Sequence, residues 1–142
     1  MRDPHCIFCQ ILAGDVPASV VYEDEATFAF MDIAQLTPGH TLIIPKVHVQ
    51  QIYDLDQETA AALGQTLVRV CRALRAAFHP IGLSVRQANG RAAGQEVPHV
   101  HFHCIPYHSP GLPKGRRHRR KRISRAELDA LAARIRAHLE HP

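Results

Sequence analysis

The amino-acid sequence predicts an α+β fold, in which a five-stranded antiparallel sheet is accompanied by one long helix, a short N-terminal helix and a C-terminal helix. Three observations carry this prediction: short apolar runs separated by turn residues, one long stretch of helical apolar spacing over 57–78, and a helix-capping pattern near residue 124. A chain of 142 residues with 46% hydrophobic residues is large enough for a single core. No apolar run approaches the roughly 18 residues of a membrane span, and the first ten residues lack signal-peptide character, so we expect a cytoplasmic protein without membrane contacts.

The first elements follow from local spacing. Residues 5–13 carry apolar side chains at near-helical intervals, and Gly14 and Pro17 end that segment. The runs SVVYE and ATFAFMD predict a hairpin around Asp24 and Glu25, and HTLIIP follows the turn TPG as a third strand. We therefore expect a short helix followed by a three-stranded antiparallel meander.

The longest helix is expected from residue 57 to about residue 78. Asp56 is the predicted N-cap, and Pro80 and Gly82 terminate the helix. One face carries an apolar stripe that consists of Ala60, Leu63, Leu67, Val70, Leu74 and Phe78. A fourth strand, LSVRQAN, then leads through the loop GRAAGQE into a fifth, EVPHVHFHCIP, in a register that allows antiparallel pairing.

The C-terminal part of the chain begins after several prolines. Ser124 and Glu127 have the spacing of a capping box, which predicts a helix from 125 to about 140. We therefore divide the chain into a main domain, residues 1–110, and a basic segment with a C-terminal helix, residues 111–142.

The net charge of +4 comes from one local run, KGRRHRRKR, at residues 114–122. Seven of its residues are Lys or Arg, and without them the rest of the chain has a net charge of about −3. The run contains no aromatic residue on which a base would stack, so a solvated loop is favoured over a nucleic-acid platform. Binding of nucleic acid through this run is the alternative that remains.

The four cysteines fall into two groups. Cys6 and Cys9 form a C-x-x-C pair, which in a reducing compartment indicates half of a metal site or a redox pair. Cys71 and Cys104 lie on apolar faces of a predicted helix and strand, where packed thiols are expected.

The fifth strand places His99, His101 and His103 at every second position, so the three imidazoles share one face and Val100, Phe102 and Cys104 share the other. A merely solvated face is a poor explanation, because histidine is a weak β-former. A metal bound by all three also fails, because they span roughly 13 Å along a strand. A neutral imidazole at the middle position can act as a nucleophile toward phosphorus.

The motif HVHFHCI resembles the signature of the histidine triad (HIT) family of nucleotide hydrolases and transferases. The segments CIFCQI, FAFMDI, TPGHTLIIPKVH and NGRAAGQEVPHVHFHCIP also resemble family segments, in family order, over residues 6–106. The main domain, residues 1–110, is then a HIT domain. The resemblance implies a HIT-like fold and a twofold homodimer in which the long helix and a sheet strand contact the partner.

The resemblance also implies the catalytic and metal-binding residues. His101 would attack the α-phosphorus of a nucleotide, giving a nucleotidyl-histidine that water hydrolyses, and His103 would hydrogen-bond to the phosphate or the leaving group. Zinc-bearing relatives use the equivalents of Cys6, Cys9, His48 and His99. Such a Cys2His2 set is closed and tetrahedral, which indicates a structural zinc. The alternative for the two cysteines is a pair of reduced thiols, and we expect His40 to lie at the surface or behind the site.

The nucleotide-binding residues follow from the same resemblance. They are Phe8, Ile11, Phe30 and Ile33 as an apolar slot for a purine, Asp32 for the ribose hydroxyls, and Asn89, Gly94, Gln95 and Glu96 near the phosphate. The apolar four could equally be core residues, and Asp32 could be a turn cap. Lys46 and Arg91 are the nearest cations in sequence, so imidazoles and backbone amides are expected to hold the phosphate. Tyr107 stands where relatives often have arginine.

The sequence therefore predicts an enzyme that hydrolyses nucleoside 5′-phosphate derivatives at the α-phosphate, of the phosphoramidate or dinucleoside polyphosphate type. Two alternatives remain: a purine-nucleotide-binding module with incidental turnover, and a protein that processes 5′-adenylated nucleic acids through the basic segment.

Overall fold

The computed structural model describes residues 2–110 and 120–140. The elements are α1 (Ile7–Leu12), β1 (Val20–Glu23), β2 (Thr27–Met31), β3 (Ala34–Gln35), β4 (Thr41–Pro45), the 3-10 helix η1 (Ile52–Asp54), α2 (Gln57–Phe78), β5 (Gly82–Arg86), the 3-10 helix η2 (Arg91–Ala93), β6 (Phe102–Tyr107), β7 (Lys121–Arg122) and α3 (Arg125–Arg136). No helix in the described ranges has the length and apolar character needed to cross a bilayer.

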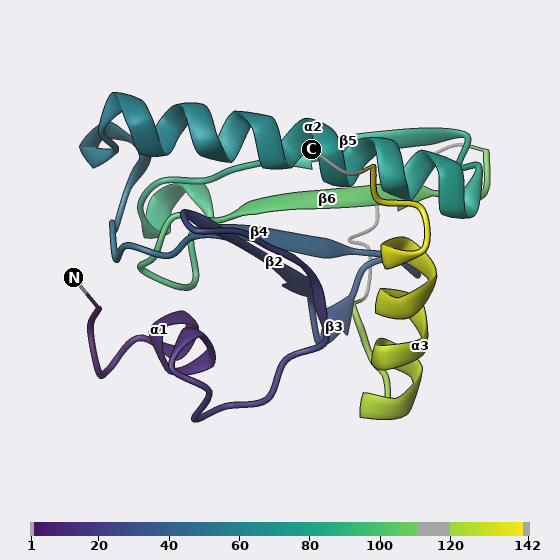
Figure 1. Cartoon of the computed structure of the whole chain (residues 1–142), viewed down its shortest axis with the longest axis horizontal. Coiled ribbons are helices and arrows are strands. Elements are labelled where there is room, and N and C mark those ends of the chain that lie inside the picture. Colours follow the sequence, from purple (N-terminus) through teal and green to yellow (C-terminus); the bar gives the residue numbers. More distant parts are fainter. Residues whose placement is uncertain (1, 111–119, 141–142) are drawn as a thin grey trace.

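Five strands form one antiparallel sheet in the order β1-β2-β4-β6-β5 (Figure 1). The predicted meander is confirmed as β1, β2 and β4. The turn between the first two strands is held by Asp24, whose Oδ1 accepts from the backbone N–H groups of Ala26 and Thr27. The predicted antiparallel pairing of the fourth and fifth strands is confirmed as β5 against β6. The sheet therefore has β1 and β5 as its two edges.

Helix α2 covers one face of this sheet, as Figure 1 shows. The side chain of Asp56 accepts from the N–H of Thr59 at 2.7 Å, which confirms the predicted N-cap. The helix ends at His79, which adopts a left-handed conformation (φ 48°) immediately before Pro80. Its buried residues are Leu63, Thr66, Val70, Ala73, Leu74 and Ala77. Ala60, expected in the apolar stripe, is exposed because the first turns of α2 extend beyond the core.

The opposite face of the sheet carries a second apolar cluster beneath α1. Phe8 and Cys9 of α1 pack there with Phe28, Phe30 and Leu42. The ring of Phe8 meets that of Phe30 edge-on, with centroids 5.5 Å apart. The long helix and the histidines thus lie on opposite sides of the sheet.

The C-terminal helix α3 packs on the same core as the main domain. The side chain of Ser124 accepts from the N–H of Glu127 at 3.1 Å, which confirms the capping interaction. Leu128, Ala132 and Ile135 are fully or almost fully buried against β1, β2 and α2. The helix ends at Arg136, about one turn earlier than predicted, because the N–H groups of His138 and Leu139 bond to the carbonyls three residues back, those of Ile135 and Arg136, and so tighten the last turn. The boundary drawn at residue 110 stays a prediction.

A two-stranded ribbon, which the sequence did not predict, joins the chain just before α3 to the loop after β2. Ala34 pairs with Arg122 and Gln35 pairs with Lys121. Residues 114–119 of the basic run lie outside the described residues, and its last three residues belong to or border this ribbon.

The histidine strand is shorter than predicted, because β6 begins only at Phe102. Pro98 has no N–H to donate, the N–H of His99 bonds to the nearby carbonyl of Val97, and the N–H of Val100 bonds to the carbonyl of Val49. His99 and His101 therefore lie on the chain leading into the strand and not in its ladder. Because this part of the chain is irregular, the rings of His99 and His101 can turn toward different partners.

Candidate active site and metal centre

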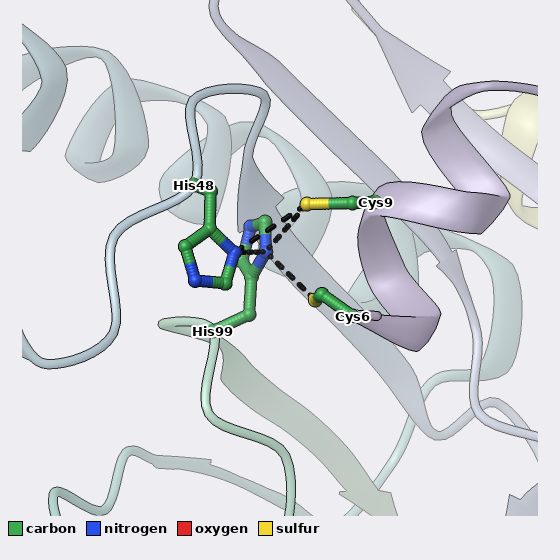
Figure 2. Close-up of side chains that lie close together, drawn as sticks. All are labelled: Cys6, Cys9, His48 and His99. Atoms are coloured by element: carbon green, nitrogen blue, oxygen red, sulfur yellow. Dashed lines mark hydrogen bonds between the residues drawn. The ribbon is translucent and has the colours of Figure 1, made fainter. Parts of the chain in front are cut away.

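Four potential metal ligands converge from separate parts of the chain (Figure 2). The Cys6 Sγ atom lies 3.4 Å from Nδ1 of His99. Cys9 Sγ lies 3.4 Å from Nδ1 of His48 and 3.6 Å from Nδ1 of His99. The two Nδ1 atoms are 3.2 Å apart. The segment before α1, α1 itself, the chain after β4 and the chain before β6 are thereby brought to one point.

These separations are those of a tetrahedral metal site. Bonds of about 2.3 Å to sulfur and about 2.05 Å to nitrogen at tetrahedral angles place sulfur about 3.6 Å from nitrogen and the two nitrogens about 3.3 Å apart. All four separations agree with these values to within about 0.2 Å.

The protonation states of His99 and Cys6 are also consistent with binding of a metal cation. Nε2 of His99 lies 2.9 Å from the carbonyl oxygen of Pro45, so that nitrogen donates and Nδ1 presents its lone pair to the cysteines. Burial lowers the pKa of His99 to about 4, which keeps the ring neutral. Burial raises the pKa of the Cys6 thiol, so two thiolates here would need a positive partner. The residues present therefore form a Cys/His metal site.

The two ring nitrogens of His101 have different roles: Nδ1 is hydrogen-bonded to the backbone, and Nε2 is available to react. Its Nδ1 lies 2.8 Å from the carbonyl oxygen of His99, which assigns the proton to Nδ1 and the lone pair to Nε2. The ring of Phe8 packs edge-on against it, with centroids 5.2 Å apart. Burial lowers the pKa of His101, which favours the neutral, nucleophilic imidazole. This tautomer is the one that attack by Nε2 requires.

His103 has the opposite tautomer, which is set by His40. The N–H of Leu36 donates to Nδ1 of His40 at 3.1 Å, so Nε2 of His40 carries the proton and donates to Nδ1 of His103 at 2.9 Å. Nε2 of His103 is consequently a donor. The rings of His101 and His103 lie with centroids 5.0 Å apart, so a hydrogen-bond donor lies beside the unprotonated Nε2 of His101.

His40 is completely buried and lies directly behind the site. It follows Gly39, whose backbone is left-handed (φ 106°) and where a Cβ atom would approach Pro106 to 3.0 Å and Phe78 to 3.1 Å. Only glycine fits that turn, and the turn directs His40 inward. Burial lowers the pKa of His40 to about 3 and that of His103 to about 4, so both rings are neutral. The expected position of His40 behind the site agrees with this geometry.

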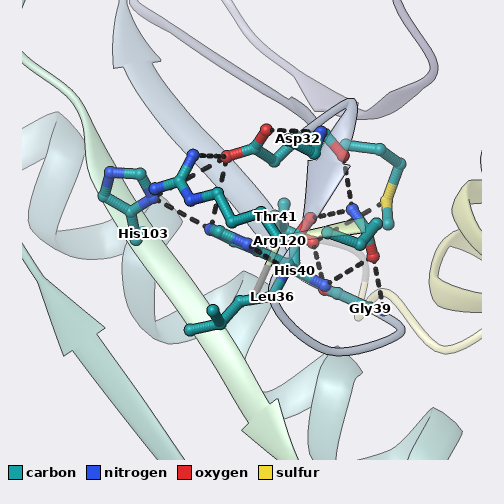
Figure 3. A network of polar contacts seen from close by, with 10 residues as sticks. Asp32, Leu36, Gly39, His40, Thr41, His103 and Arg120 are labelled. Atoms are coloured by element: carbon teal, nitrogen blue, oxygen red, sulfur yellow. Dashed lines mark hydrogen bonds and ion pairs between the residues drawn. The ribbon is translucent and has the colours of Figure 1, made fainter. Parts of the chain in front are cut away.

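Asp32 is the centre of the polar network in Figure 3. Its Oδ1 accepts from the N–H of Ala34 at 2.9 Å, while Oδ2 lies 3.3 Å from a guanidinium nitrogen of Arg120 and 3.5 Å from Nε2 of His40. Burial raises the pKa of this carboxyl, and the Ala34 N–H and Arg120 partly offset that effect. The turn-capping and ligand-binding explanations are both compatible with these contacts, because the two oxygens have different partners.

A cleft of about 320 Å³ opens between α1 and the histidines. His101 and His103 line it together with Phe8, Ile11, Phe30, Asp32, Ile33, Gly94 and Glu96, all of which were predicted around the nucleotide. Phe8 and Phe30 are also packed in the apolar cluster, so they serve as both core and wall. Ile33 is 43% exposed, which fits a slot wall better than a core residue.

Asn89 and Gln95 have other contacts. The Oδ1 of Asn89 accepts from the N–H of Ile52 at 2.7 Å. The amide of Gln95 accepts from the N–H of Gly90 at 2.7 Å and donates to the carbonyl of Gln50 at 2.7 Å. Both side chains therefore brace the loops around the cleft, and their contact with a phosphate stays a prediction.

Arg86 and Arg120 are the functional candidates that sequence reasoning missed. Arg86 is the Cα partner of His103 in the pairing of β5 with β6, and antiparallel partners point to the same face. Arg120 is brought to Asp32 by the β3–β7 ribbon. Arg86 could have been found by writing out the register of the fourth and fifth predicted strands. Arg120 could not, because strands of two residues show no hydrophobic periodicity in the sequence.

The HIT domain profile matches residues 13–109 of the chain. The chain belongs to the HIT family. Protein hit of Bacillus subtilis is 48% identical over 107 residues, covering 75% of this chain and 74% of that protein. The adenosine 5′-monophosphoramidase hnt1 of Schizosaccharomyces pombe is 42% identical over 101 residues, covering 71% of this chain and 78% of that protein.

A solved structure adds the metal to this comparison. The Zn-bound histidine triad family protein of Mycobacterium smegmatis superposes with a TM-score of 0.78 at 35% identity, covering 94% of this chain and 91% of that one. The HIT fold predicted from the motifs is thus confirmed, and the Cys/His cluster has a zinc-bearing relative.

Proposed function

We propose that this HIT protein hydrolyses nucleoside 5′-phosphate derivatives at the α-phosphorus through a nucleotidyl-His101 intermediate. The observation that carries the proposal is the pair of opposite tautomers: Nε2 of His101 presents a lone pair, and Nε2 of the adjacent His103 presents a proton. A purine would occupy the slot lined by Phe8 and Ile33, and its ribose hydroxyls would bond to Asp32. Relatives that are adenosine 5′-monophosphoramidases support an adenylate with a nitrogen leaving group as one substrate.

The first step forms a bond between Nε2 of His101 and phosphorus. The bond from phosphorus to the leaving atom breaks, and its electron pair departs with that atom, which takes up a proton from water when it is nitrogen. The Nδ1 proton stays on the ring, hydrogen-bonded to the carbonyl of His99, which stabilises the positive charge of the substituted imidazole. His103 donates from Nε2 to a phosphoryl oxygen or to the leaving atom, which lowers the barrier where negative charge develops.

The second step returns the enzyme to its starting state. Water attacks the phosphorus, the bond to His101 breaks, and its electron pair returns to Nε2. The products are a nucleoside 5′-monophosphate and a proton released to solvent. Asp32 holds the same ribose throughout, so the nucleotide stays in line for both steps.

We also propose that Cys6, Cys9, His48 and His99 hold a structural zinc ion. All four protein ligands are present, so no position is left for water or substrate, which is typical of structural sites. The ion would fasten α1 to the chain that carries His101. Because His99 is both a ligand and, through its carbonyl, the partner of His101, the ion supports the orientation of the nucleophile.

A twofold homodimer is the proposed assembly, formed along the outer edge of β5. Within the described residues, β5 pairs only with β6 and leaves its other edge unpaired. Ile81 and Val85 at this edge and Val68 on α2 are large apolar side chains with 64%, 45% and 50% exposure. An edge strand beside an apolar patch is suited to pairing with a second copy.

Mass spectrometry of the intact protein tests the mechanism. Wild type and His101→Asn are mixed with adenosine 5′-phosphoramidate and quenched without acid, since phosphohistidine is acid-labile. An adenylyl adduct on wild type alone is expected. Turnover by the Asn variant at the wild-type rate would reject the mechanism, whereas AMP binding without adduct or product would identify a binding module.

A further inference from the structure

A second cleft of about 790 Å³ lies beside the nucleotide cleft. Gly94, His103 and Arg120 line both clefts, so the two are lobes of one depression that meet at His103. The nucleotide lobe is bounded by His101 and Asp32. The second lobe lies on the far side of His103, where the group that departs from phosphorus would emerge.

The second lobe is positively charged. Arg86 and Arg120 contribute to its wall, and none of the described residues that line it is acidic. Both guanidinium groups act on His103, because each disfavours its protonated form. The carboxylates of Asp32 and Glu96 belong to the wall of the nucleotide lobe. Oδ2 of Asp32 lies 3.3 Å from a guanidinium nitrogen of Arg120, so among the described residues Arg86 is the cation of the second lobe that has no carboxylate partner.

Arg86 is held in place by its neighbours on the sheet. Its guanidinium donates to the hydroxyl of Tyr107 at 3.0 Å, and that hydroxyl also lies 3.0 Å from Oγ of Ser84. Ser84, Arg86, His103 and Tyr107 share one face through the register of β5 and β6. Arg86 is thus fixed on the same face of the sheet as His103.

We infer that the second lobe binds the leaving group of the substrate and that it selects one carrying its own phosphate. This inference rests on the proposed function and narrows its substrate class to nucleoside polyphosphates. Two planar guanidinium groups can each form paired hydrogen bonds with phosphate oxygens. A neutral amine offers no oxygen to accept from them.

The chemistry of departure also favours a leaving phosphate over a leaving amine. When a bridging oxygen departs from the α-phosphorus, the electron pair of the broken bond adds one negative charge to the leaving phosphate, and Arg86 and Arg120 stabilise that charge. When an amine departs, its nitrogen must instead gain a proton, which water supplies, because the neutral ring of His103 can donate a hydrogen bond but has no proton to give up. The arginines therefore assist the first reaction more than the second.

Binding to a variant that cannot turn over provides the first test. In a His101→Asn background, calorimetry compares the affinities of ADP and AMP. ADP is expected to bind at least about tenfold more tightly, and Arg86→Gln is expected to remove most of that preference. Lys121→Gln, on the same ribbon as Arg120 but lining neither lobe, is the matched control and should retain the preference. Equal affinities for ADP and AMP before any change to Arg86 would overturn the inference.

Kinetics in the otherwise unaltered full chain provide the second test. The ratio of kcat/KM for ADP to that for adenosine 5′-phosphoramidate should fall about tenfold in Arg86→Gln and further in Arg86→Gln/Arg120→Gln. Arg86→Lys, which keeps the charge, should restore part of the ratio. Equal losses for both substrates would overturn the leaving-group assignment while leaving the proposed function intact. Absence of an adenylyl-His101 adduct with every substrate would instead reject the proposed function.

Discussion

Nε2 of His40 lies 2.9 Å from Nδ1 of His103, and this contact determines which nitrogen of His103 faces the cleft. The proton on His40 is itself assigned by a backbone donor, the N–H of Leu36. A chain of two hydrogen bonds therefore runs from the backbone to the site. His40 is fully buried and does not line the nucleotide cleft, and its Nε2 lies 2.9 Å from Nδ1 of His103 and 3.5 Å from Oδ2 of Asp32. We therefore expect it to be a positioning residue that acts chiefly through the shorter contact, with His103.

Replacing His40 with Ala is expected to lower kcat for adenosine 5′-phosphoramidate by about 10-fold to 100-fold, because Nδ1 of His103 loses its donor. The affinity for AMP should change little. His40→Gln, which keeps one donor and one acceptor, should recover part of kcat. Steady-state kinetics and calorimetry measure the two quantities. An equal loss of kcat and AMP affinity in His40→Ala would show that the residue supports only folding of the cleft.

Asp32→Asn is expected to remove selectivity for ribose. The amide oxygen can still accept from the N–H of Ala34, so the turn is kept while the charge is lost. Hydrogen bonds to a charged group contribute about 1.5–3 kcal/mol, so AMP affinity should fall at least about tenfold. Wild type should prefer AMP to its 2′,3′-dideoxy analogue, and the variant should bind both alike. A wild-type protein that binds the two equally would contradict the role of Asp32.

Removal of the metal is expected to destabilise the chain by several kcal/mol. Zinc binding to Cys/His sites in peptides is worth about 10–16 kcal/mol before ordering costs. Cys6→Ser should purify without zinc and unfold at a lower urea concentration. Cys71→Ser, a change of the same chemistry in a free, half-buried thiol, should retain zinc. The prediction fails if wild type contains no zinc and is no more stable than Cys6→Ser.

Stability is expected to decrease as the pH falls from about 6.5 toward 4. The pKa of His103 is about 4 in the folded protein, against 6.5 for an ordinary histidine. Between these values the unfolded chain binds more protons than the folded one, so acid favours unfolding. The charged or titratable groups around His103 are Asp32, His40, Arg86, His101 and Arg120.

His103→Asn isolates this contribution, because metal release affects both proteins alike. Its free energy of unfolding should vary less steeply with pH than that of wild type, by at most about 1.4 kcal/mol per pH unit. Urea titrations at pH 7, 6 and 5 provide the slopes. Identical slopes for the two proteins would show that His103 keeps an ordinary pKa.

Ile81→Glu is expected to weaken the proposed dimer on the order of 100-fold or more. The change would place a carboxylate in the apolar patch at the edge of β5, where burial of an unpaired charge against the second copy is costly. Light scattering across a dilution series measures the dissociation constant. Tyr53→Glu changes a more exposed aromatic in η1 and should leave the assembly unaltered. A monomeric wild-type protein would refute the dimer.

The sheet, α2 and the capping of α3 could be predicted because their signals are local. Strand alternation, the cap at Asp56 and the Ser124–Glu127 spacing each act over a few residues. The metal ligands and the proposed nucleophile were predicted from the motif resemblance, and the structure brings all four ligands together. Local patterns and family motifs thus account for most of the fold and the centre of the site.

The remaining features depend on long-range contacts that a pattern does not encode. The ribbon between Ala34 and Arg122 has only two residues on each side, and its effect is to deliver Arg120 to Asp32. The burial of His40 follows from the packing of Gly39 against Phe78 and Pro106, which are distant in sequence. Such contacts become apparent only when the sheet is assembled.

The carbonyl of His99 accepts from His101 while the ring of His99 completes the metal centre. Residues 99–101 thus contribute both to the metal site and to the orientation of His101. The length of this segment cannot change without disturbing both. Inserting one residue between His99 and His101 would break the two-residue spacing by which the carbonyl of the metal-site residue His99 accepts from Nδ1 of His101. Residues 99–101 should therefore tolerate changes of the middle side chain more readily than any insertion or deletion, a constraint on how this part of the chain can evolve.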